Sequence, residues 1–536
     1  MRLLNQKLFL YLLFALIITS CGTTQLVTTP IADIDNTPLK FNPLTDAEEK
    51  VWAHLDFISD TIPGMSVDKA YNEVLKSKKG TKVIVAVIDS GIDIDHEDLD
   101  DVIWKNKHEV PNNNKDDDNN GYVDDVHGWN FLGEGYDEQL EYVRLLVSGD
   151  TKHPRYAEAQ AEYQKEYQQT NSAKTQYEQL FSQIKTSDAA ISKYLSKDIY
   201  TRKEVASIQT EDQNLLQHKS VIIQTYGFDI GSISETKTYF EGAIKSFTER
   251  LSINLNKELK GRKTGDDPNI LNDKPGYGNG NVKPRSKDES HGTHVAGIIA
   301  AERNNNKGVN GVANNVIIMP IRVVSNGDEY DKDVALAIRY ASDNGAKVIN
   351  MSFGKYYSPH SDWVKNAIIY AEQKDVLLIS GAGNESLNLD NKTSYPNDHE
   401  NGVEFVSNFM SVGATEPKYG SGIIGSYSNY GKNTVDVFAP GSKIYSTYPN
   451  NTYEFADGTS MAAPAVAGVA ALIRSQYPKL SAAQVKQVIM DSGLPLKTKV
   501  VVGGDSNKIK HFGELSKSSK LVNVYNALIM ASKISN

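Results

Sequence analysis

The chain of 536 residues is long enough for one large domain with additions, or for about three domains of ordinary size. Its formal net charge of −10 argues against a protein that holds nucleic acid through phosphate contacts, because such proteins need clustered lysines and arginines. Its one cysteine, Cys21, excludes an intrachain disulfide, so stability outside the cytoplasm would have to come from packing and from bound ions.

The N-terminus has the features of an export signal. Arg2 and Lys7 precede an apolar run at residues 8–19, which is too short to cross a bilayer comfortably but matches the core of a secretory signal. The small residue before Cys21 resembles the lipobox of bacterial lipoproteins. We therefore expect a signal peptide at residues 1–20, a lipid anchor on Cys21 and a location in the bacterial cell envelope, on the periplasmic face or the cell surface. The alternative is an ordinary signal peptide with an incidental thiol.

Residues 21–60 are expected to form the lipidated tether and an N-terminal extension, because residues 22–45 are rich in threonine and proline without a sustained period. Beyond them, TKVIVAVIDSG at 81–91 is a run of β-branched residues that ends at Asp89. Such a run is typical of a strand buried on both faces of a parallel sheet. Taken alone, an aspartate at a strand end is usually a turn former.

The acidic stretch DDDNNGYVDD at 116–125 suggests a metal site. Four of its oxygen-bearing residues follow the spacing at the start of a helix-loop-helix calcium loop, namely Asp116, Asp118, Asn120 and Asp124. The twelfth position is His127, whereas a loop of that type needs a bidentate glutamate there. We expect a structural calcium ion, and the alternative is a solvated acidic turn.

Residues 133–274 form a block of different composition. They are rich in Gln, Glu, Lys, Tyr and Ala, and no proline occurs between Pro154 and Pro268. Good helix formers without breakers predict long, partly amphipathic helices. We interpret the block as an inserted helical subdomain that could act as a lid, bind an unknown partner or stand in solvent.

Residues 333–354 and 363–384 each have the pattern of a helix followed by a buried strand. Two such units in succession imply right-handed crossovers. The predicted fold class is therefore α/β, with a doubly wound, mainly parallel sheet, helices on both faces and a long helical insertion. Such sheets place ligands at the carboxyl ends of their strands.

Two polar residues stand at the start of helices made almost wholly of small apolar residues. His291 opens one of them in SHGTHVAGIIAA, and Ser460 opens the other in FADGTSMAAPAVAGVAALIR. The second helix has no charge between Asp457 and Arg474, so we expect it to be buried on all sides. Together with Asp89, these are the residue types of an activated hydroxyl, in which a base accepts the serine proton and a carboxylate orients the imidazole.

The segments VIDSG, HGTHVAG and GTSMAAP together resemble the three signatures of the subtilisin-like serine proteases, the subtilases of peptidase family S8, in that family's chain order. The resemblance implies that Asp89 is the orienting carboxylate, His291 the general base and then acid, and Ser460 the nucleophile. It covers residues 61–132 and 275–532 as a catalytic domain and leaves the insertion unexplained. A loop can lengthen at small entropic cost, so the insertion still allows the three residues to meet.

The resemblance also implies a binding cleft. Asn384, in SGAGNES, matches the family's oxyanion-hole asparagine, which acts together with the backbone N–H of Ser460. The two walls that hold an extended substrate backbone would be formed by Ser352, Phe353 and Gly354 on one side and by Ala382 and Gly383 on the other.

The sequence thus predicts an exported, lipid-anchored serine endopeptidase that acts on polypeptides through an acyl-enzyme, with no catalytic cofactor and no nucleic-acid partner. Two alternatives remain open. One is a triad-bearing scaffold whose helical insertion binds a partner, with little proteolysis. The other is an esterase that uses the same three residues.

Overall fold

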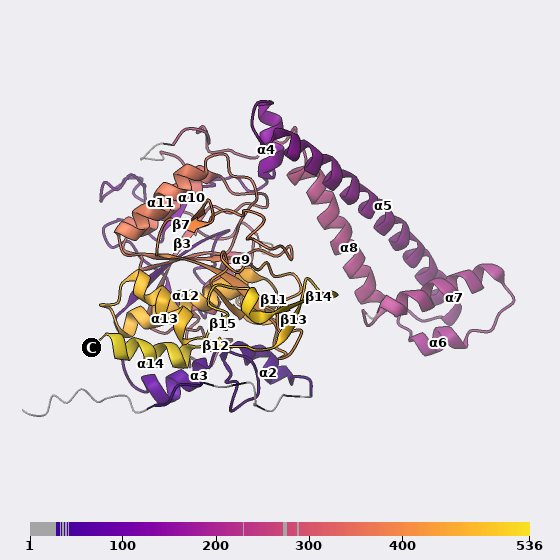
Figure 1. The fold of residues 1–536 in the computed structure, drawn as a ribbon. Coiled ribbons are helices and arrows are strands. Elements are labelled where there is room, and N and C mark those ends of the chain that lie inside the picture. Colours follow the sequence, from indigo (N-terminus) through magenta and orange to yellow (C-terminus); the bar gives the residue numbers. More distant parts are fainter. Residues whose placement is uncertain are drawn as a thin grey trace, which may run out of the picture.

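A nine-stranded sheet forms the centre of the protein (Figure 1). The computed structural model describes residues 28–535 apart from 33, 35, 36, 38, 39, 41, 229, 272–275, 287 and 288. The strands of the sheet, in spatial order, are β12 (Leu494–Pro495), β15 (Lys520–Leu521), β9 (Val437–Pro440), β8 (Phe409–Thr415), β5 (Leu377–Gly381), β4 (Val348–Met351), β1 (Val83–Asp89), β3 (Val316–Arg322) and β2 (Trp129–Asn130). All neighbours pair in parallel except β12 with β15, which confirms the predicted mainly parallel sheet.

Helices cover both faces of this sheet (Figure 1). One face carries α9 (His291–Ala300), α12 (Thr459–Gln476), α13 (Ala482–Ser492) and α14 (Val524–Ile534), and the other carries α10 (Asp331–Asp343) and α11 (Ser361–Gln373). The apolar run of strand β1 is continuous because its residues alternate between two hydrophobic cores, one on each face of the sheet. Val85 and Val87 belong to the core on the first face, whereas Ala86 and Ile88 belong to the core on the second.

Helix α12 lies inside the molecule, as its lack of charge predicted. From Met461 to Ser475 every residue of the helix is buried. Small side chains allow this close approach, because a Cβ on Gly468 would lie 2.6 Å from the Cβ of Val312. The first turn of α12 therefore has a tightly determined position relative to the sheet.

The predicted insertion is helical and extends from the body as an arm (Figure 1). Its helices are α4 (Glu141–Ser148), α5 (Tyr156–Leu195), α6 (Arg202–Ser207), α7 (Gln213–Thr225) and α8 (Ile233–Glu249), followed by the short π-helix η5 (Arg250–Asn254). The 40 residues of α5 span about 60 Å at 1.5 Å per residue. Helix α8 returns beside α5, and residues of α5, α7 and α8 share a small apolar core that includes Phe181, Ile222 and Phe240.

The N-terminal extension packs more closely than the sequence predicted. It contains α2 (Asp46–Val51), η1 (Trp52–His54), α3 (Val67–Lys69) and η2 (Ala70–Leu75). The Trp52 indole is buried and donates from Nε1 to the carbonyl oxygens of Ser442 and Lys443. Within the predicted tether, Ile34 is also buried, and the backbone N–H of Ile31 donates to Asn526. Ile31 and Ile34 thus pack against the folded body.

Short antiparallel hairpins complete the fold. They pair β6 (His399–Glu400) with β7 (Val403–Glu404), β10 (Ile444–Tyr448) with β11 (Thr452–Ala456), and β13 (Lys499–Val502) with β14 (Asp505–His511). Within the part of the chain that the structure describes, no helix has the length and apolar character needed to cross a membrane. The apolar run at 8–19 and Cys21 lie outside the described residues.

Candidate active site

Asp89 and His291 meet at the carboxyl edge of the sheet. Asp89 is the last residue of β1, and His291 is the first residue of α9. The His291 Nδ1 lies 2.8 Å from the Asp89 Oδ1, although 202 residues separate the two in sequence. Asp89 is buried, and its Oδ1 also accepts the Ser90 backbone N–H at 2.7 Å. These two contacts fix the position of the Asp89 Oδ1 beside the imidazole.

The pKa of His291 is raised. Partial burial opposes the charged imidazolium, but attraction and hydrogen bonding to the Asp89 carboxylate outweigh it. The side chain is 38% exposed, so its outer edge is open to solvent. His294, one turn further along α9, differs because it is buried and faces the carbonyl oxygens of Ile444 and Glu454; burial lowers its pKa to about 4.

Ser460 lies in the first turn of α12, beside the end of the next strand. Strand β4 pairs with β1 through Ile88 and Met351, so Ser352 follows at the same edge as Asp89. The Ser460 hydroxyl donates to the Ser352 carbonyl at 3.1 Å, and the Ser352 hydroxyl donates to the Ser460 carbonyl at 2.9 Å. Among the described residues no hydrogen bond joins His291 to Ser460.

Asn384 directs its amide oxygen toward Thr459, the first residue of α12. Its Oδ1 accepts the backbone N–H of Thr459 at 2.9 Å and the Thr459 hydroxyl at 3.1 Å, which leaves Nδ2 on the other side. A Cβ placed on Gly458 would lie 3.5 Å from the Asn384 Nδ2 and 3.6 Å from the Ser460 backbone N. Two N–H donors therefore flank one small region next to the serine, which suits a developing oxyanion.

A cavity of about 240 Å³ opens beside Ser460. Three groups of residues line it: 324 and 327–329 from the loop after β3, 352–356 after β4, and 380–385 with 394–396 from the segments after β5. All five residues predicted to bind substrate, Ser352, Phe353, Gly354, Ala382 and Gly383, are among them. The structure thus brings the expected walls together around the serine.

Several lining residues were not found from the sequence. Thr459 supports the wall after β5, because its hydroxyl accepts the Gly383 backbone N–H at 3.0 Å in addition to its bonds with Asn384. Lys355 is buried directly after Gly354, and its backbone exchanges two hydrogen bonds with Tyr395. Thr459 could have been noticed as the neighbour of Ser460, whereas nothing near Lys355 in the sequence indicates its long-range partners.

One of the four predicted calcium ligands, Asp118, lies in a cluster of three carboxylates. Oxygen atoms of Glu109, Asp118 and Asp125 lie within 4.8 Å of one another. Glu109 and Asp125 are buried, and the Glu109 Oε2 has no hydrogen-bond partner among the described residues. Separations of this size and an unsatisfied buried carboxylate oxygen fit the oxygen ligands of a hard cation.

The other predicted ligands have different partners. Both oxygens of Asp116 accept backbone N–H groups, those of Asn120 and Gly121, and both oxygens of Asp124 accept those of Asn113 and Asn114. The amide nitrogen of Asn120 donates to the two clustered aspartates, and its oxygen accepts from Tyr122. Asp116 and Asp124 thus shape the turn that holds the cluster.

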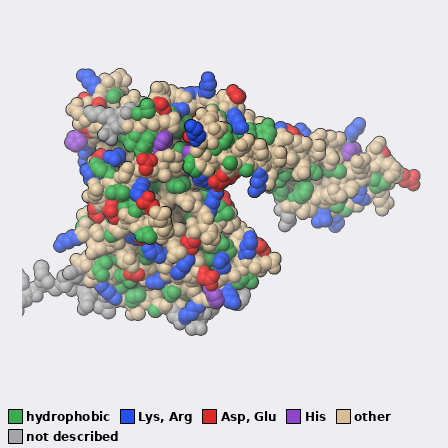
Figure 2. All heavy atoms as spheres, turned by 45° about the horizontal axis from the view of Figure 1, so that its top comes forward, with side chains coloured by type: hydrophobic (Ala, Val, Ile, Leu, Met, Phe, Trp, Pro, Cys, Tyr) green, Lys and Arg blue, Asp and Glu red, His purple; other side chains and the backbone are tan. Residues whose placement is uncertain are grey.

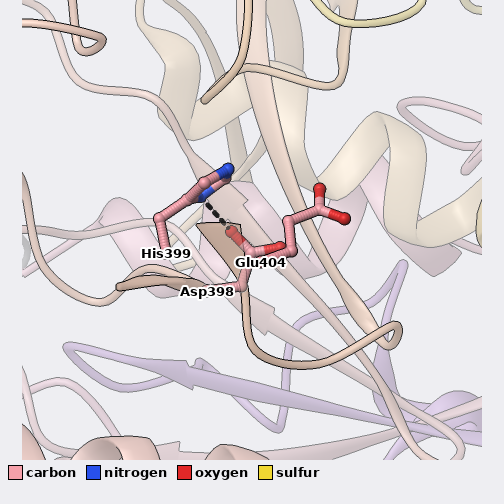
Figure 3. A group of neighbouring side chains, drawn as sticks. All are labelled: Asp398, His399 and Glu404. Atoms are coloured by element: carbon pink, nitrogen blue, oxygen red, sulfur yellow. Dashed lines mark ion pairs between the residues drawn. The ribbon is translucent and has the colours of Figure 1, made fainter. Parts of the chain in front are cut away.

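A second acidic group, Asp398, His399 and Glu404, lies on the hairpin of β6 and β7 (Figure 3). The His399 Nδ1 is 2.6 Å from the Asp398 Oδ1, and the Lys486 ammonium lies 3.2 Å from the Glu404 Oε1 and 3.6 Å from the Asp398 Oδ2. A lysine already supplies the positive charge at this position, which disfavours a metal cation.

Comparison with known protein families matches residues 80–513 to the subtilase family, peptidase family S8. The chain therefore belongs to the subtilase family of subtilisin-like serine peptidases. It is similar to a thermophilic serine proteinase of Bacillus sp. (strain AK1), with 44% identity over 188 residues that cover 35% of this chain and 43% of the relative. It is also 42% identical to thermitase of Thermoactinomyces vulgaris over 187 residues, which cover 35% of this chain and 61% of thermitase. The matches thus span less than two thirds of these relatives.

Among solved structures, a protease from Pseudoalteromonas arctica PAMC 21717 is 29% identical and covers 47% of this chain and 79% of its own, with a TM-score of 0.38. The family assignment rests on the sequence match over residues 80–513.

We expect the His291 imidazole to titrate above the usual histidine value of about 6.5, and Asp89→Asn to lower its pKa. The substitution removes the negative charge that favours the imidazolium but keeps the burial that opposes it. Histidine ring signals followed by NMR over pH, assigned with His291→Ala, measure this. The control Asp95→Asn removes an exposed carboxylate that pairs with Lys283 and should leave the titration unchanged. An equal titration in wild type and Asp89→Asn would contradict the assigned pair.

Proposed function

We propose that the protein is an exported, lipid-anchored serine endopeptidase that hydrolyses peptide bonds through an acyl-enzyme. The observation that carries this proposal is the contact of His291 with the buried Asp89 carboxylate at the same sheet edge as Ser460, next to a cleft with two N–H donors. The membership in the subtilase family supports the same reaction.

In the proposed mechanism His291 is the general base. The Ser460 hydroxyl turns from the Ser352 carbonyl toward the imidazole, which is a rotation about one side-chain bond. As the serine oxygen bonds to the substrate carbonyl carbon, its proton passes to the Nε2 of His291, and Asp89 stabilises the imidazolium. The imidazolium then gives this proton to the leaving amine when the C–N bond breaks. In the second half, the same imidazole takes a proton from water as the water oxygen bonds to the ester carbon. The imidazolium returns this proton to the Ser460 oxygen when the ester C–O bond breaks, which releases the acid and restores the serine.

The oxyanion of the tetrahedral intermediate would lie between the Asn384 Nδ2 and the Ser460 backbone N–H. Thr459 holds the Asn384 amide in place from its oxygen side, so the donor is oriented before substrate arrives. A donor oriented in advance needs no reorganisation during the reaction, which is why such groups contribute strongly to rate.

The substrate would be an extended polypeptide segment. The cleft is lined by main-chain segments after β3, β4 and β5, and such edges bind a peptide chiefly through its backbone. An esterase with the same residues would not need such walls, so the cleft favours peptides.

The alternative function, a scaffold whose insertion binds a partner, is supported by the long arm. Its surface mixes charged side chains of both signs with hydrophobic ones (Figure 2). Ile199, in the segment between α5 and α6, is 88% exposed. Reaction of Ser460 with a serine-directed reagent separates the two functions, because a scaffold without catalysis has no reason to activate that hydroxyl.

We also propose that Cys21 carries a lipid anchor in the cell envelope. The support is the sequence of residues 1–21, which combines early positive charges, a short apolar run and a small residue before the cysteine. The backbone N–H of Ile31 donates to Asn526 of the folded body.

A structural calcium ion is proposed at Glu109, Asp118 and Asp125. The unpartnered Glu109 Oε2 and the close approach of three carboxylates support it. The ion would offset the repulsion among these groups and tie the segment around residue 109 to the turn at 118–125. It would not take part in the chemistry.

We expect a fluorophosphonate probe to label the detergent-solubilised full chain and to leave Ser460→Ala unlabelled. Asn384→Leu should lower kcat by about 10²–10³, which corresponds to the roughly 2.7–4 kcal/mol known for such a donor in subtilisin, with a smaller change in KM.

Labelling should slow as pH falls through the raised pKa of His291, because the protonated imidazole cannot accept the serine proton. Ser386→Ala, which removes a neighbouring hydroxyl bonded to Ser426, is the control and should label normally. If the wild-type chain is not labelled in the presence of calcium, the proposal that the protein is a serine peptidase is wrong.

For the anchor, we expect mass spectrometry of protein from the membrane fraction to show a mature chain that begins at Cys21 and carries added acyl chains. Cys21→Ser should appear in the soluble fraction or stay uncleaved. An unmodified cysteine in an otherwise mature chain would refute the lipid anchor.

For the proposed calcium site, we expect the Tm of the wild-type chain to be higher in the presence of calcium than in the presence of a chelator. A ligand at about 100 times its Kd stabilises the folded state by about 2.7 kcal/mol. Glu109→Gln should remove most of this calcium-dependent rise. Asp124→Asn is the matched control, because both its oxygens face backbone N–H groups. It should lower the Tm equally with and without calcium. Equal Tm values for the wild-type chain in calcium and in chelator would rule out the site.

A further inference from the structure

We propose that the helical insertion positions the walls of the substrate cleft and that Glu141, at the start of α4, is the positioning residue through which it does so. This inference rests on the proposed peptidase function. It concerns a part of the chain that the subtilase signatures do not explain, and it is carried by the contacts that α4 and its flanking residues make with two cleft walls at once.

The first of the two lining segments that the insertion contacts is the loop after β3, and the insertion lies along its outer edge. The backbone N–H of Asn326 donates to the Tyr136 carbonyl at 3.0 Å, and that of Asp328 donates to the Gln139 carbonyl at 3.2 Å. Residues 136–139 do not line the cavity, whereas 327–329 do. The insertion therefore supports this wall from behind and leaves its inner edge free for a peptide.

The end of the insertion returns to the same place. The Asn254 amide, in the last turn of the returning segment, donates to the carbonyl oxygens of Glu138 and Asn326 at 3.0 and 2.8 Å. Both ends of the arm are thus fastened at one cleft wall. A displacement of the arm relative to the body would strain these bonds first.

Lys355 connects the second wall to the insertion. It follows Gly354 directly and is 4% exposed. Its ammonium lies 2.7 Å from the Glu141 Oε2, 2.9 Å from the Asp331 Oδ1 and 2.6 Å from the Glu329 carbonyl. Its backbone also holds Tyr395, which lines the third side of the cavity. Lys355 therefore joins the loop after β3 through its ammonium and Tyr395 through its backbone.

Glu141 bridges the two walls. Its carboxylate contacts the Lys355 ammonium, and its backbone N–H donates to the Asp328 Oδ2 at 2.7 Å. Burial alone would raise the pKa of Glu141, but Arg144 and Lys355 lower it to about 2, so the carboxylate stays charged at working pH. Arg144 in turn donates to the carbonyl oxygens of Asp328 and Glu329.

A second contact between the insertion and this wall involves the next helix, α5. The Arg155 guanidinium, at the start of α5, donates to the carbonyl of Tyr356, which lines the cavity. The Tyr357 hydroxyl donates to Glu162 of α5 at 3.0 Å. The arm thus contacts the second wall from two of its helices.

The physical consequence concerns the binding of extended peptides more than the reaction at the serine. A peptide that enters between two walls as an added strand needs them at a set spacing. The triad and Asn384 depend on α9, α12 and the strand ends, which the insertion does not touch through these bonds. Loss of the Glu141 carboxylate should therefore raise KM for peptides while the reactivity of Ser460 toward a small reagent persists.

The test compares two readouts on the full chain. The first is kcat and KM for an internally quenched peptide that the wild-type chain cleaves, and the second is the rate of inactivation by a small dialkyl fluorophosphonate that needs only the triad and the oxyanion donors. For Glu141→Gln we expect KM to rise about tenfold with the inactivation rate within about twofold of wild type. For Arg155→Ala, whose side chain is partly exposed, we expect a rise of about threefold in KM.

Glu166→Gln is the matched control. Glu166 pairs with Arg250 and Tyr142 inside the insertion and touches neither cleft wall. It should lower the Tm without changing KM. The proposal is overturned if Glu141→Gln and Arg155→Ala leave KM at the control value. It is also overturned if they reduce inactivation and peptide turnover in parallel, because that is a general loss of structure. A wild-type chain that does not react with the fluorophosphonate refutes the peptidase itself, which is a separate outcome.

Discussion

The burial of α12 against the sheet is the constraint on which the candidate site depends. Every residue of this helix from Met461 to Ser475 is enclosed, and its small side chains leave no freedom to slide without creating voids or clashes. The first turn therefore has one position, next to the ends of β1 and β4. Ser460 and its backbone N–H arrive at the sheet edge because the helix behind them cannot be elsewhere. Asp89 and His291 reach the same edge by the same means, from β1 and α9.

Buried charge organises the surroundings of this edge. Removing a lysine from water costs several kcal/mol unless it is well paired, and Lys355 has two carboxylates and a carbonyl around its ammonium. Such a group tolerates few alternative arrangements, because any movement leaves a buried charge without a partner. The same reasoning applies to the buried pair of Arg322 and Glu289, in which the arginine also donates to the carbonyl of Ser90 beside Asp89. The cleft is thus held by polar contacts with defined geometry as well as by apolar packing.

The arm extends this arrangement away from the body. Its distal core of residues such as Phe181, Ile222 and Phe240 gives it internal stability, and both of its ends are fastened at the cleft wall around Asn326. An appendage that only stood in solvent would need no such fastening. The two roles considered for it, partner binding and support of the cleft, are therefore compatible, since whatever held the far end would be connected through α5 and α8 to the wall.

How much the sequence determined varies from feature to feature. The apolar run of β1, the uncharged helix after Ser460, the helix-then-strand units and the polar helical block are local patterns, and each predicted its element because period and burial depend on neighbouring residues. The triad was inferred because three motifs resemble known signatures, and the Asp89–His291 distance agrees with their pairing. The calcium ligands were less predictable. Spacing suggested Asp116 and Asp124, but backbone N–H groups occupy their oxygens, and the cluster instead includes Glu109 from outside the motif.

Sequence by itself therefore determined the elements and the family, because these depend on residues close together in the chain or on motifs that resemble known ones. Only the tertiary structure decided that Lys355 joins Glu141, 214 residues away, and that Asn254 and Tyr136 hold the same wall. The sequence around each of these residues contains no pattern that identifies its partner. They exist because folding excludes water around charged groups, and each such group must then be satisfied by whatever the fold has placed beside it.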